Sequence, residues 1–416
     1  MKVYCLDIRR TPFCKIFTEL SCFSPLDMGV ELTNKFVQQL HYNIQIDQLI
    51  ASSVMLDPAI PNLAREIVIR SKLPKTIPAH FVTNYCISSL LSTGLATSLI
   101  KSGQAKSVLC LGVEMMSKPK FFLSDRFSDK LVKLNREKNI LTKLKIALGI
   151  KFKDLKPLTP SPKEPSTNLS MGESCELMNR EYGVSRLEQD QYALRSHKKA
   201  VEAIDNGYIQ SQIIEVNGVF RDNIPRRDSS VEKLSKLPPV FAQNGTLTAG
   251  NSSALTDGAS VGLFVSEDIC KNFGVDPLFE VVDFVFTAVA INDGLLMAPV
   301  LAVSQILERN KLHPSEIDIF EIHEAFACQI LINLKVLEQG WPKYAVKPTK
   351  IELTKVNIWG GSLAFGHPFA ATGLRLLANA GWILKKTSQK LALVASCAAG
   401  GGGAAFLIKN PNLTSL

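Results

Sequence analysis

Short apolar runs alternate with longer amphipathic stretches along most of the chain. The apolar runs read as strands, and several are apolar on both faces, as expected for a sheet covered by helices on either side. The stretches between them repeat apolar residues at helical spacing. This alternation predicts an α/β protein with a central sheet. The strand candidates are VYCLDI, SVLCLGV, FEVVDFVFTAVA, IDIFEIHEAF and KLALVAS, and two helix candidates are SPLDMGVELTNKFVQQL and RLEQDQYALRSHKKAVEAIDNG.

The pattern changes between about residues 116 and 245, where charged sequence is punctuated by proline, as in DLKPLTPSPKEPSTN. Small-residue, sheet-like sequence then resumes with NGTLTAGNSSALTDGASVGLFVSED. We therefore expect a loop domain at residues 116–244. It would be inserted into an N-terminal half formed by residues 1–115 and 245–267, and a C-terminal half would follow at residues 268–416.

The two halves echo each other. Cys86 precedes a small-residue helix and a strand that starts at Ser107, and His367 precedes a similar helix and a strand that starts at Leu391. A duplicated fold would produce this echo. Unrelated α/β units also have similar lengths, so a coincidence is the alternative.

The composition is that of a globular protein. Hydrophobic residues make up 46% and charged residues 20% of the 416 residues, and the chain is long enough for two or three packed units. The nine cysteines form an odd set without a CxxC pair, so neither a disulfide framework nor a zinc knuckle is indicated, and a reducing compartment fits best. We expect no signal peptide and no membrane span, because the apolar stretches are too short or too interrupted.

Most of the net charge of +9 comes from one segment. Residues 118–156 hold twelve Lys or Arg against four Asp or Glu. Within this segment, Leu134, Leu141, Leu144 and Leu148 have helical spacing with lysines between them, which is a basic amphipathic pattern. Two interpretations are open: a solvated helix packed on its own protein, or a helix that lies on an anionic membrane surface.

Three positions combine a reactive side chain with an unusual setting. Cys86 stands near an expected helix start, where the helix dipole favours a thiolate and lowers the pKa from about 8.5. His367 lies between a glycine-rich turn and a helix whose first position suits Pro368. Cys397 ends a strand and enters CAAGGGG, a turn so poor in side chains that backbone N–H groups can approach a ligand oxygen. The three are candidates for a nucleophile, a rigid imidazole and a thiol beside an oxyanion site.

The other cysteines and histidines give weaker signals. Cysteines in apolar surroundings are usually small hydrophobic residues, and four histidines have no partner visible in the sequence. His323 is followed by Glu324, but a zinc protease needs a second His four residues on, where this chain has Ala327, so a metal site is rejected. No dinucleotide or ATP phosphate loop is found either. The positions assigned to core or surface are Cys5, Cys110, Cys270, Cys328, His41, His80, His197 and His313.

Five motifs occur in the order found in one family. RRTPF resembles that family's opening motif, NYCISS its nucleophile segment, GTLTAGNSSALTDGAS its G-N-S-x-x-x-D-G-A box, GGSLAFGHPFAATG its G-H-P box and CAAGGGGAAFL its C-terminal cysteine turn. On these motifs the chain resembles the thiolases over nearly its whole length. The resemblance implies a duplicated five-layered α-β-α-β-α fold with an inserted loop domain.

Two departures narrow the resemblance. HEAF stands where most thiolases have Asn-Glu-Ala-Phe, and Ala399 stands where most have glycine. Both are similar to the β subunits of bacterial and mitochondrial fatty-acid-oxidation trifunctional complexes, which are acetyl-CoA C-acyltransferases that pair with a hydratase and dehydrogenase α subunit. The loop domain of such relatives carries a helical insertion associated with membrane surfaces. The resemblance therefore gives the membrane interpretation of residues 118–156 more weight.

The resemblance implies thiolytic cleavage of a 3-ketoacyl-CoA by CoA. Cys86, activated by His367, would form an acyl thioester, and Cys397 would protonate the leaving enolate and then deprotonate CoA. His367 together with His323 would form one oxyanion site. The backbone N–H groups of Cys86 and Ala399 would form the second.

The family also implies how ligands and partners bind. Ser253 in the GNSS box and Arg226 in NIPRR would bind CoA, with Arg227 an alternative one position on. CoA is a substrate here, and we expect neither a permanently bound cofactor nor a nucleic-acid partner. A homodimer or a dimer of dimers is implied, as is a cytoplasmic protein of bacterial type that is peripheral at the inner membrane if the insertion binds lipid.

Three other functions share parts of this pattern. A ketoacyl synthase has the fold and a cysteine nucleophile but no second cysteine, so Cys397 argues against it. A biosynthetic thiolase of the acetoacetyl-CoA type would use the same residues. A non-enzymatic lipid carrier is disfavoured because all four catalytic positions are filled, although Tyr85 replaces the usual small residue before Cys86 and would narrow the pocket.

Overall fold

The computed structural model describes residues 1–40, 42–159, 161 and 163–413. His41, which the sequence assigned to core or surface, lies outside the described residues. Within them, ten strands form one mixed sheet, in which the short β2 (Cys14–Lys15) pairs with β6 beside the main path. Along that path the strands are β4 (Ala79–Val82), β3 (Gln48–Ser52), β5 (Ser107–Met115), β6 (Thr256–Ser266), β1 (Val3–Arg10), β7 (Phe279–Ala288), β10 (Gly402–Lys409), β9 (Leu391–Ala398) and β8 (Ile319–Ile322).

The sheet consists of two halves with the same strand pairing. In the first half, β3 lies parallel between β4 and β5, and β5, β6 and β1 follow in antiparallel order. In the second half, β8 lies parallel to β9, and β9, β10 and β7 follow in antiparallel order. The halves meet where β1 pairs with β7 through Tyr4↔Glu280 and Cys5↔Phe279. The duplication suggested by the sequence is confirmed.

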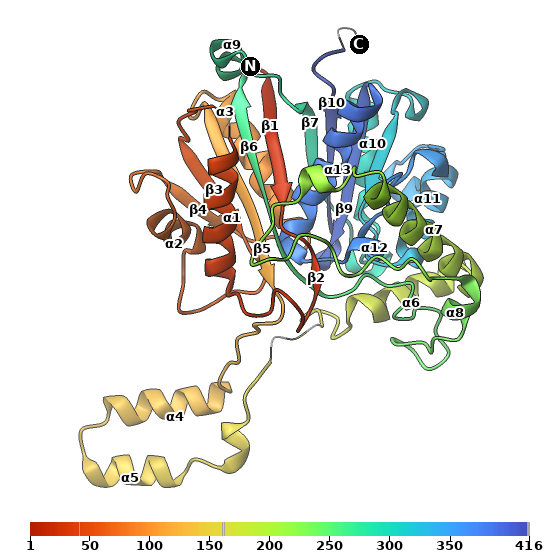
Figure 1. Cartoon of the computed structure of the whole chain (residues 1–416). Coiled ribbons are helices and arrows are strands. Elements are labelled where there is room, and N and C mark those ends of the chain that lie inside the picture. Colours follow the sequence, from red (N-terminus) through yellow and green to blue (C-terminus); the bar gives the residue numbers. More distant parts are fainter. Residues whose placement is uncertain (41, 160, 162, 414–416) are drawn as a thin grey trace.

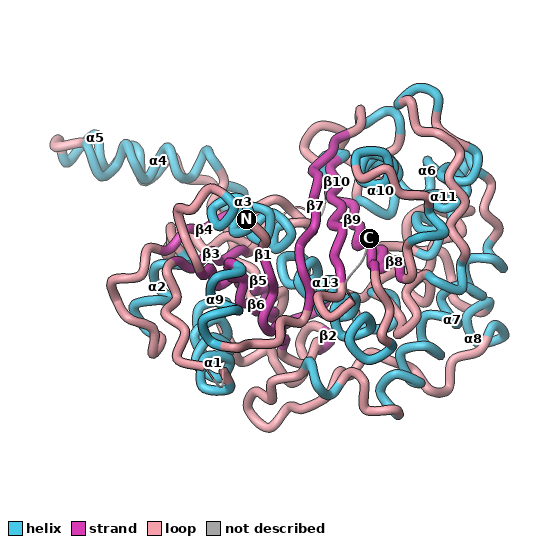
Figure 2. Tube along the Cα trace, turned by 90° about the horizontal axis from the view of Figure 1, so that it is seen from above, coloured by secondary structure: helices cyan, strands magenta, loops and turns pink. Residues whose placement is uncertain are grey.

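Helices form three layers around these two halves (Figures 1 and 2). α3 and α13 pack on each other in the middle layer, and α13 contacts strands of both halves. α1 and α2 cover the outer face of the first half, and α10 covers that of the second, with α11 packed beside α10. This is the expected five-layered α-β-α-β-α arrangement. The bounds are α1 (Pro25–Gln39), α2 (Leu63–Arg70), α3 (Ser88–Lys101), α10 (Ala298–Arg309), α11 (Ala327–Gln339) and α13 (Phe369–Thr387).

Small residues let the two central helices approach each other closely. A Cβ on Gly373 of α13 would lie 2.7 Å from Leu90 Cγ and 2.8 Å from Ser89 Oγ of α3. A Cβ on Gly94 of α3 would lie 2.9 Å from the ring of Phe286 on β7. Close packing between the two halves of the sheet therefore explains why α3 is so rich in Ser, Thr, Gly and Ala. It also brings the residues that precede α3 and α13 to the same end of the molecule.

The chain leaves the sheet after β5 and returns with β6, its antiparallel neighbour. α6, α7 and α8 lie on the second half, where α7 contacts α11 and α12. α4 and α5 instead form a hairpin that projects away from the rest of the molecule (Figure 1), which we call the arm (residues 125–148). The domain boundaries stay predictions. The bounds are α4 (Asp125–Arg136), α5 (Ile140–Leu148), α6 (Met171–Tyr182), α7 (Arg186–Asp205), α8 (Val231–Ser235), α9 (Glu267–Phe273) and α12 (Ser362–Phe365).

The arm differs from the single helical stretch that its leucine spacing suggested. α4 ends at Arg136, and α5 begins after Asn139, whose Oδ1 accepts the N–H groups of Leu141 (2.9 Å) and Thr142 (3.4 Å). This side chain caps a second helix. Leu134 therefore lies on α4, while the other three leucines lie on α5. None of the described helices is long and apolar enough to cross a membrane.

Candidate active site

Cys86 lies in the turn between β4 and α3, two residues before the helix begins. The preceding Tyr85 has a left-handed backbone (φ 46°), and the Ser88 hydroxyl donates to the Tyr85 carbonyl (2.6 Å), which holds this turn in place. The N–H of Ala399, from the turn after β9, is near enough to the Cys86 sulfur to favour its thiolate. The expected position of Cys86 near a helix start is confirmed.

The Cys86 thiol does not have the lowered pKa that a helix start suggested. Burial raises its pKa to about 12, although the N–H groups of Ala399 and of Cys86 itself favour the thiolate. The nearby carboxylate of Glu114 opposes ionisation. The sequence-based expectation was wrong because it took the dipole of an open helix end into account and not the desolvation of a sulfur enclosed by other segments. The thiol therefore needs a base in order to react.

His367 is held between α12 and α13. Its N–H donates to the Ala254 carbonyl (3.0 Å) and to Thr256 Oγ1 (2.9 Å), and its Nδ1 lies 2.7 Å from Thr372 Oγ1. Pro368 takes the N-cap of α13 and not its first helical position, which is one residue earlier than predicted. Burial lowers the pKa of His367 to about 3, with a further contribution from the Arg375 charge. The imidazole is therefore neutral near pH 7, with a lone pair on one of its two ring nitrogens.

Gly366 allows the approach of His367. It has φ 82°, and a Cβ there would lie 2.2 Å from Thr256 Oγ1. A larger residue would displace the strand-like segment that positions the His367 backbone.

His323 follows directly after β8 and faces His367. Its N–H donates to the Ala395 carbonyl of β9 (2.8 Å), and its Nδ1 lies 2.8 Å from Ser362 Oγ. The ring centroids of the two histidines are 4.1 Å apart. Burial, the neighbouring His367 and the Arg375 charge all lower the pKa of His323 well below its usual value. Among the described residues, neither histidine has a hydrogen-bond partner at Nε2, which leaves both nitrogens available to a ligand.

Cys397 lies on β9, two residues beyond Ala395, and is buried. Burial raises its pKa, and the proximity of Cys86 raises it further. The turn that follows needs glycine, because Gly400 and Gly401 both have φ 73°. The Cys86 sulfur is thus close to both Cys397 and the Ala399 amide, and the two imidazoles follow the ends of β8 and α12.

Packing between the central helices holds the two sets of residues together. The Leu374 N–H of α13 donates to Ser89 Oγ of α3 (3.0 Å). The Ala370 N–H donates to Glu114 Oε2 (3.2 Å), and the same carboxylate accepts the N–H of Met55 (2.9 Å). The four predicted catalytic residues therefore come together at one end of the α3–α13 pair, with the Ala399 amide among them.

Glu164 is a residue at this site that sequence reasoning missed. Its Oε1 accepts the Gly400 N–H (2.6 Å), and the residue is 6% exposed. Its own backbone is fixed by a tight turn, in which the Glu164 N–H donates to the Leu169 carbonyl (2.9 Å) and the Asn168 N–H donates to the Glu164 carbonyl (2.8 Å). Asn168 has φ 57°, and asparagine tolerates this conformation better than most residues. The PSTN turn was the available signal, but it does not show which side chain points inward.

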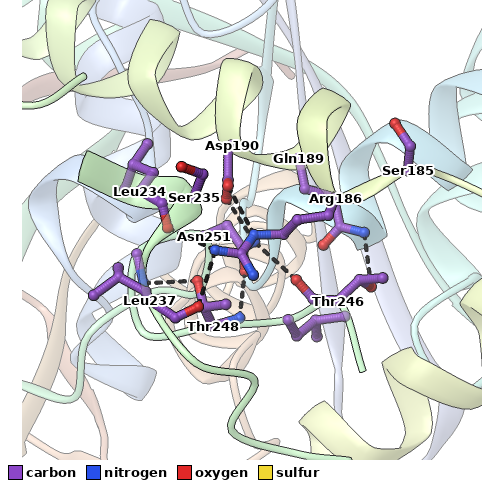
Figure 3. Close-up of polar contacts among 12 residues, drawn as sticks. Ser185, Arg186, Gln189, Asp190, Leu234, Ser235, Leu237, Thr246, Thr248 and Asn251 are labelled. Carbon is purple, nitrogen blue, oxygen red and sulfur yellow. Dashed lines mark hydrogen bonds and ion pairs between the residues drawn. The ribbon is translucent and has the colours of Figure 1, made fainter. Parts of the chain in front are cut away.

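Ser253 is half-buried, and its N–H donates to the Ala325 carbonyl (2.9 Å), so the GNSS box lies against the HEAF segment. Asn251 of the same box has a structural role (Figure 3). Its amide nitrogen donates to Asp190 Oδ1 (3.0 Å) and to the Thr246 carbonyl (3.1 Å), while Asp190 also pairs with Arg186 of α7 (2.7 Å). These contacts attach the box to α7 and leave Ser253 at the edge of the site.

Arg226 and Arg227 both line an open cavity of about 370 Å³ beside α7. Arg227 pairs with Asp205 (Nη1 to Oδ2, 2.7 Å), whereas the Arg226 guanidinium has no ion pair among the described residues. Ile224 lies against Gly366, because a Cβ on that glycine would be 2.5 Å from Ile224 Cδ1. The arginines therefore follow directly on a segment that touches the turn before His367.

The residues assigned to core or surface lie in those places. His80 and His313 are exposed, and the four cysteines are buried. His197 is buried, and its Nδ1 accepts the Arg226 N–H (3.3 Å), a partner that the sequence did not reveal. Within residues 1–40, 42–159, 161 and 163–413, no group of three or more His, Cys, Asp or Glu side chains is arranged to hold a metal ion.

The sequence matches two family descriptions in succession. The thiolase N-terminal domain covers residues 3–268, and the thiolase C-terminal domain covers residues 275–410. The chain belongs to the thiolase family. The resemblance seen in the sequence motifs is therefore confirmed, and with it the fold class.

Similar proteins share most of the length of this thiolase. A curated relative named 3-ketoacyl-CoA thiolase, from Pseudoalteromonas translucida (strain TAC 125), is 36% identical over 416 residues, covering 96% of this chain and 95% of the relative. The mitochondrial trifunctional enzyme subunit beta of Rattus norvegicus is 40% identical over 374 residues, covering 88% and 78%. The structure of human mitochondrial 3-ketoacyl-CoA thiolase in complex with CoA matches with a TM-score of 0.83 and 26% identity, covering 98% of both chains.

Proposed function

We propose that this thiolase is an acetyl-CoA C-acyltransferase of fatty-acid β-oxidation, which uses CoA to cleave a 3-ketoacyl-CoA into acetyl-CoA and a shortened acyl-CoA. The observation that carries the proposal is the pair of sulfurs, Cys86 and Cys397, around the Ala399 amide. One sulfur can hold an acyl group while the other moves a proton. The relatives named 3-ketoacyl-CoA thiolase support this assignment, since they match over nearly the whole chain.

The first half-reaction begins at Cys86. His367 Nε2 takes the thiol proton, and the thiolate attacks the 3-keto carbon of the substrate. The bond between C2 and C3 then breaks, which leaves the shortened acyl group as a thioester on Cys86 and releases an enolate of acetyl-CoA. Cys397 gives its proton to that enolate carbon. A base is required at the start because burial raises the pKa of Cys86 to about 12.

The second half-reaction reverses the roles of the sulfurs. The Cys397 thiolate takes the proton of an incoming CoA thiol, and the CoA sulfur attacks the acyl thioester on Cys86. Collapse of the tetrahedral intermediate releases the shortened acyl-CoA, and the Cys86 thiolate recovers its proton from His367. The acyl group is thus transferred in two steps through one covalent intermediate.

Two sets of donors stabilise the negative oxygens. The N–H of Ala399 points at the Cys86 sulfur, next to the place where the keto oxygen becomes an oxyanion, and the Cys86 N–H is the second donor there. The enolate oxygen of the acetyl-CoA unit lies near His323 and His367, whose Nε2 atoms are free. The methyl group of Ala399 leaves the N–H in place, so the usual glycine is not needed for this function.

CoA extends from the sulfurs across the segment that carries Arg226. Solved thiolases with CoA bound support CoA as the ligand. We assign the contact with the nucleotide phosphates to Arg226, because Arg227 is already paired with Asp205. Ser253 lies at the edge of the GNSS box, where the pantetheine would pass. In this scheme the loop domain at residues 116–244 supplies CoA contacts, and the two halves supply the reacting groups.

Partners follow from the same resemblance. The match to trifunctional enzyme subunit beta supports pairing with a hydratase and dehydrogenase α subunit. A homodimer or a dimer of dimers is the assembly we propose. The chemistry requires reduced cysteines, so the cytoplasm is the proposed location.

The arm is proposed to contact an anionic membrane surface. Ile140, Leu144 and Leu148 lie at i, i+4 and i+8 on α5 and are 76%, 58% and 77% exposed. A helix packed on its own protein would bury this face. The neighbouring Lys143 and Lys145 would meet anionic headgroups.

Turnover measurements test the reaction. The purified protein is incubated with CoA and 3-ketoacyl-CoAs of several chain lengths, and release of acetyl-CoA is compared between the wild type and Cys86→Ala. We expect turnover in the wild type and loss in the variant. Unchanged turnover in Cys86→Ala, or none in the wild type at any chain length, would overturn the assignment.

Vesicle flotation tests the arm. We expect the wild type to float with anionic phospholipid vesicles, and the triple variant Ile140→Asp, Leu144→Asp, Leu148→Asp to remain in the dense fraction, as should a deletion of residues 128–150. Leu187→Asp is the matched control, because Leu187 is an exposed leucine (55%) on α7 outside the arm. Equal flotation of all variants contradicts the membrane contact.

A further inference from the structure

A buried chain of hydrogen bonds lies behind His323. Arg375 Nη2 donates to Ser362 Oγ (2.5 Å), and Ser362 Oγ lies 2.8 Å from His323 Nδ1. All three residues are fully buried. Glu321, on β8 two residues before His323, places its Oε2 3.8 Å from Arg375 Nη1. The three segments that meet here are β8, α12 and α13.

The direction of each bond in this chain can be worked out from the chemistry of the groups. A guanidinium can only donate, so Ser362 Oγ accepts from Arg375. The serine hydroxyl has one proton of its own, and His323 Nδ1 is the acceptor within its reach among the described residues. If Nδ1 carried a proton instead, the buried hydroxyl hydrogen would have no partner, which costs about 1–3 kcal/mol. Nδ1 therefore accepts, and the proton of the neutral imidazole is on Nε2.

His367 is in a different situation. Thr372 Oγ1 lies 2.7 Å from its Nδ1 and also 3.4 Å from the Pro368 carbonyl, four residues earlier on the helix. The threonine hydroxyl can therefore donate to that carbonyl and accept from Nδ1–H. This arrangement leaves a lone pair on His367 Nε2. The structure thus permits opposite tautomers in two rings whose centroids are 4.1 Å apart.

We propose that Arg375 and Ser362 are positioning residues that lock His323 in the Nε2–H tautomer, so that it is a permanent hydrogen-bond donor beside a His367 that is a base. The proposal rests on the proposed function for its purpose: an enolate oxygen needs a donor, and a thiol needs a base. Without the lock, two neutral imidazoles in contact could exchange roles. With the lock, the fold itself determines that His323 donates a hydrogen bond and that His367 accepts a proton.

The state of His323 can be measured without any turnover. In protein labelled with [¹⁵N]histidine, protonated and unprotonated ring nitrogens have well separated chemical shifts, and the His323 signals are assigned by their loss in His323→Asn. We expect the wild type to show a protonated Nε2 and an unprotonated Nδ1 at His323. In Ser362→Ala the hydroxyl is removed, and we expect the two His323 tautomers to become mixed.

The chain offers a matched control for this substitution. Ser315 Oγ lies 2.7 Å from His313 Nδ1, which is the same kind of pair on the surface and without an arginine behind it. Ser315→Ala should leave the His323 signals and the turnover unchanged. Ser362→Thr, which keeps a hydroxyl, should restore most of the wild-type signal pattern.

Kinetics give the second readout. Ser362→Ala is expected to lower kcat about tenfold with little change in KM, which is less than the loss of 100-fold or more that removing an oxyanion donor outright causes. A lower Tm with unchanged His323 signals and kcat would show a merely structural serine and overturn the proposal. A protonated Nδ1 at His323 in an active wild type would also overturn it. Correct His323 signals in a protein that cleaves no 3-ketoacyl-CoA would instead contradict the proposed function alone.

Discussion

The two halves of the molecule repeat one backbone plan and place different side chains on it. Cys86 stands before α3 in the first half, and His367 stands before α13 in the second. The Cys86 turn is strained at Tyr85 and remains partly exposed, whereas the His367 backbone is fixed by Ala254 and Thr256. In the proposed mechanism, the repeated position carries the nucleophile in one half and the base in the other.

A second pair of equivalent positions lies at the ends of β5 and β9. Glu114 pairs with Gly258 of β6, and Cys397 pairs with Gly403 of β10, at the same point of the two halves of the sheet. Glu114 accepts N–H groups from Val54, Met55 and Ala370 and so holds the turns around it. In the second half the same position carries a thiol. In the proposed mechanism, the first half uses this position for structure and the second half uses it for proton transfer.

The largest expected effect comes from removing the rigid base. His367→Ala should lower kcat for thiolytic cleavage by about 10²–10⁴-fold, since a thiol with a pKa of about 12 needs a base in order to react near pH 7. Steady-state kinetics with a 3-ketoacyl-CoA measure this effect. Wild-type kcat in His367→Ala would show that His367 does not activate Cys86.

The pH dependence of alkylation tests whether the pKa of Cys86 is raised. Its raised pKa means that the thiolate fraction increases about tenfold for each pH unit throughout the neutral range. The rate of Cys86 modification by iodoacetamide, read by peptide mass spectrometry, should follow this rise between pH 6 and pH 9. The exposed Cys22 reports reagent activity in the same sample. A rate that is constant over this range would mean a preformed thiolate.

The structural role of the equivalent position is tested at Glu114. Glu114→Ala leaves several buried N–H groups without an acceptor, so the free energy of unfolding should fall by about 1–3 kcal/mol. Glu114→Gln keeps one acceptor oxygen and should lose less. Urea titration measures both, with Glu66→Ala, at a partly exposed glutamate of α2, as control. If Glu114→Ala were as stable as the wild type, Glu114 would not have the structural role that distinguishes it from Cys397.

The strands of the two halves and the local surroundings of the site residues could be predicted from the sequence. The strand candidates lie in β1, β5, β7, β8 and β9, because runs that are apolar on both faces have few other places in a folded chain. The positions of Cys86, His367 and Cys397 beside helix starts and a glycine turn could also be predicted, since those signals are local. The break at Asn139 was missed because one capping side chain outweighed a continuous leucine pattern.

Long-range contacts account for the remaining differences. The pKa of Cys86 depends on segments far along the chain that enclose the sulfur, and no local pattern contains this information. The same holds for Arg375 and Ser362 behind His323, which are 13 residues apart and join different helices. Glu164 lies 236 positions from Gly400, and only the folded chain brings them together.

The smallest expected effect is at Glu164. Two substitutions there separate the influence of its charge on Cys86 from that of its hydrogen bond to the Gly400 N–H. Glu164→Gln keeps an acceptor for the Gly400 N–H. It removes a charge that raises the pKa of Cys86, although burial and Glu114 raise that pKa more. Alkylation of Cys86 at a fixed pH should therefore become roughly twofold to fivefold faster. Glu164→Ala also releases the turn, so it should lose kcat although its thiol ionises more easily. Glu173→Gln, at a partly exposed glutamate in the first turn of α6, is the control. Equal behaviour of Glu164→Gln and Glu164→Ala would mean that charge alone, and not the hydrogen bond to the turn, links this loop to the site.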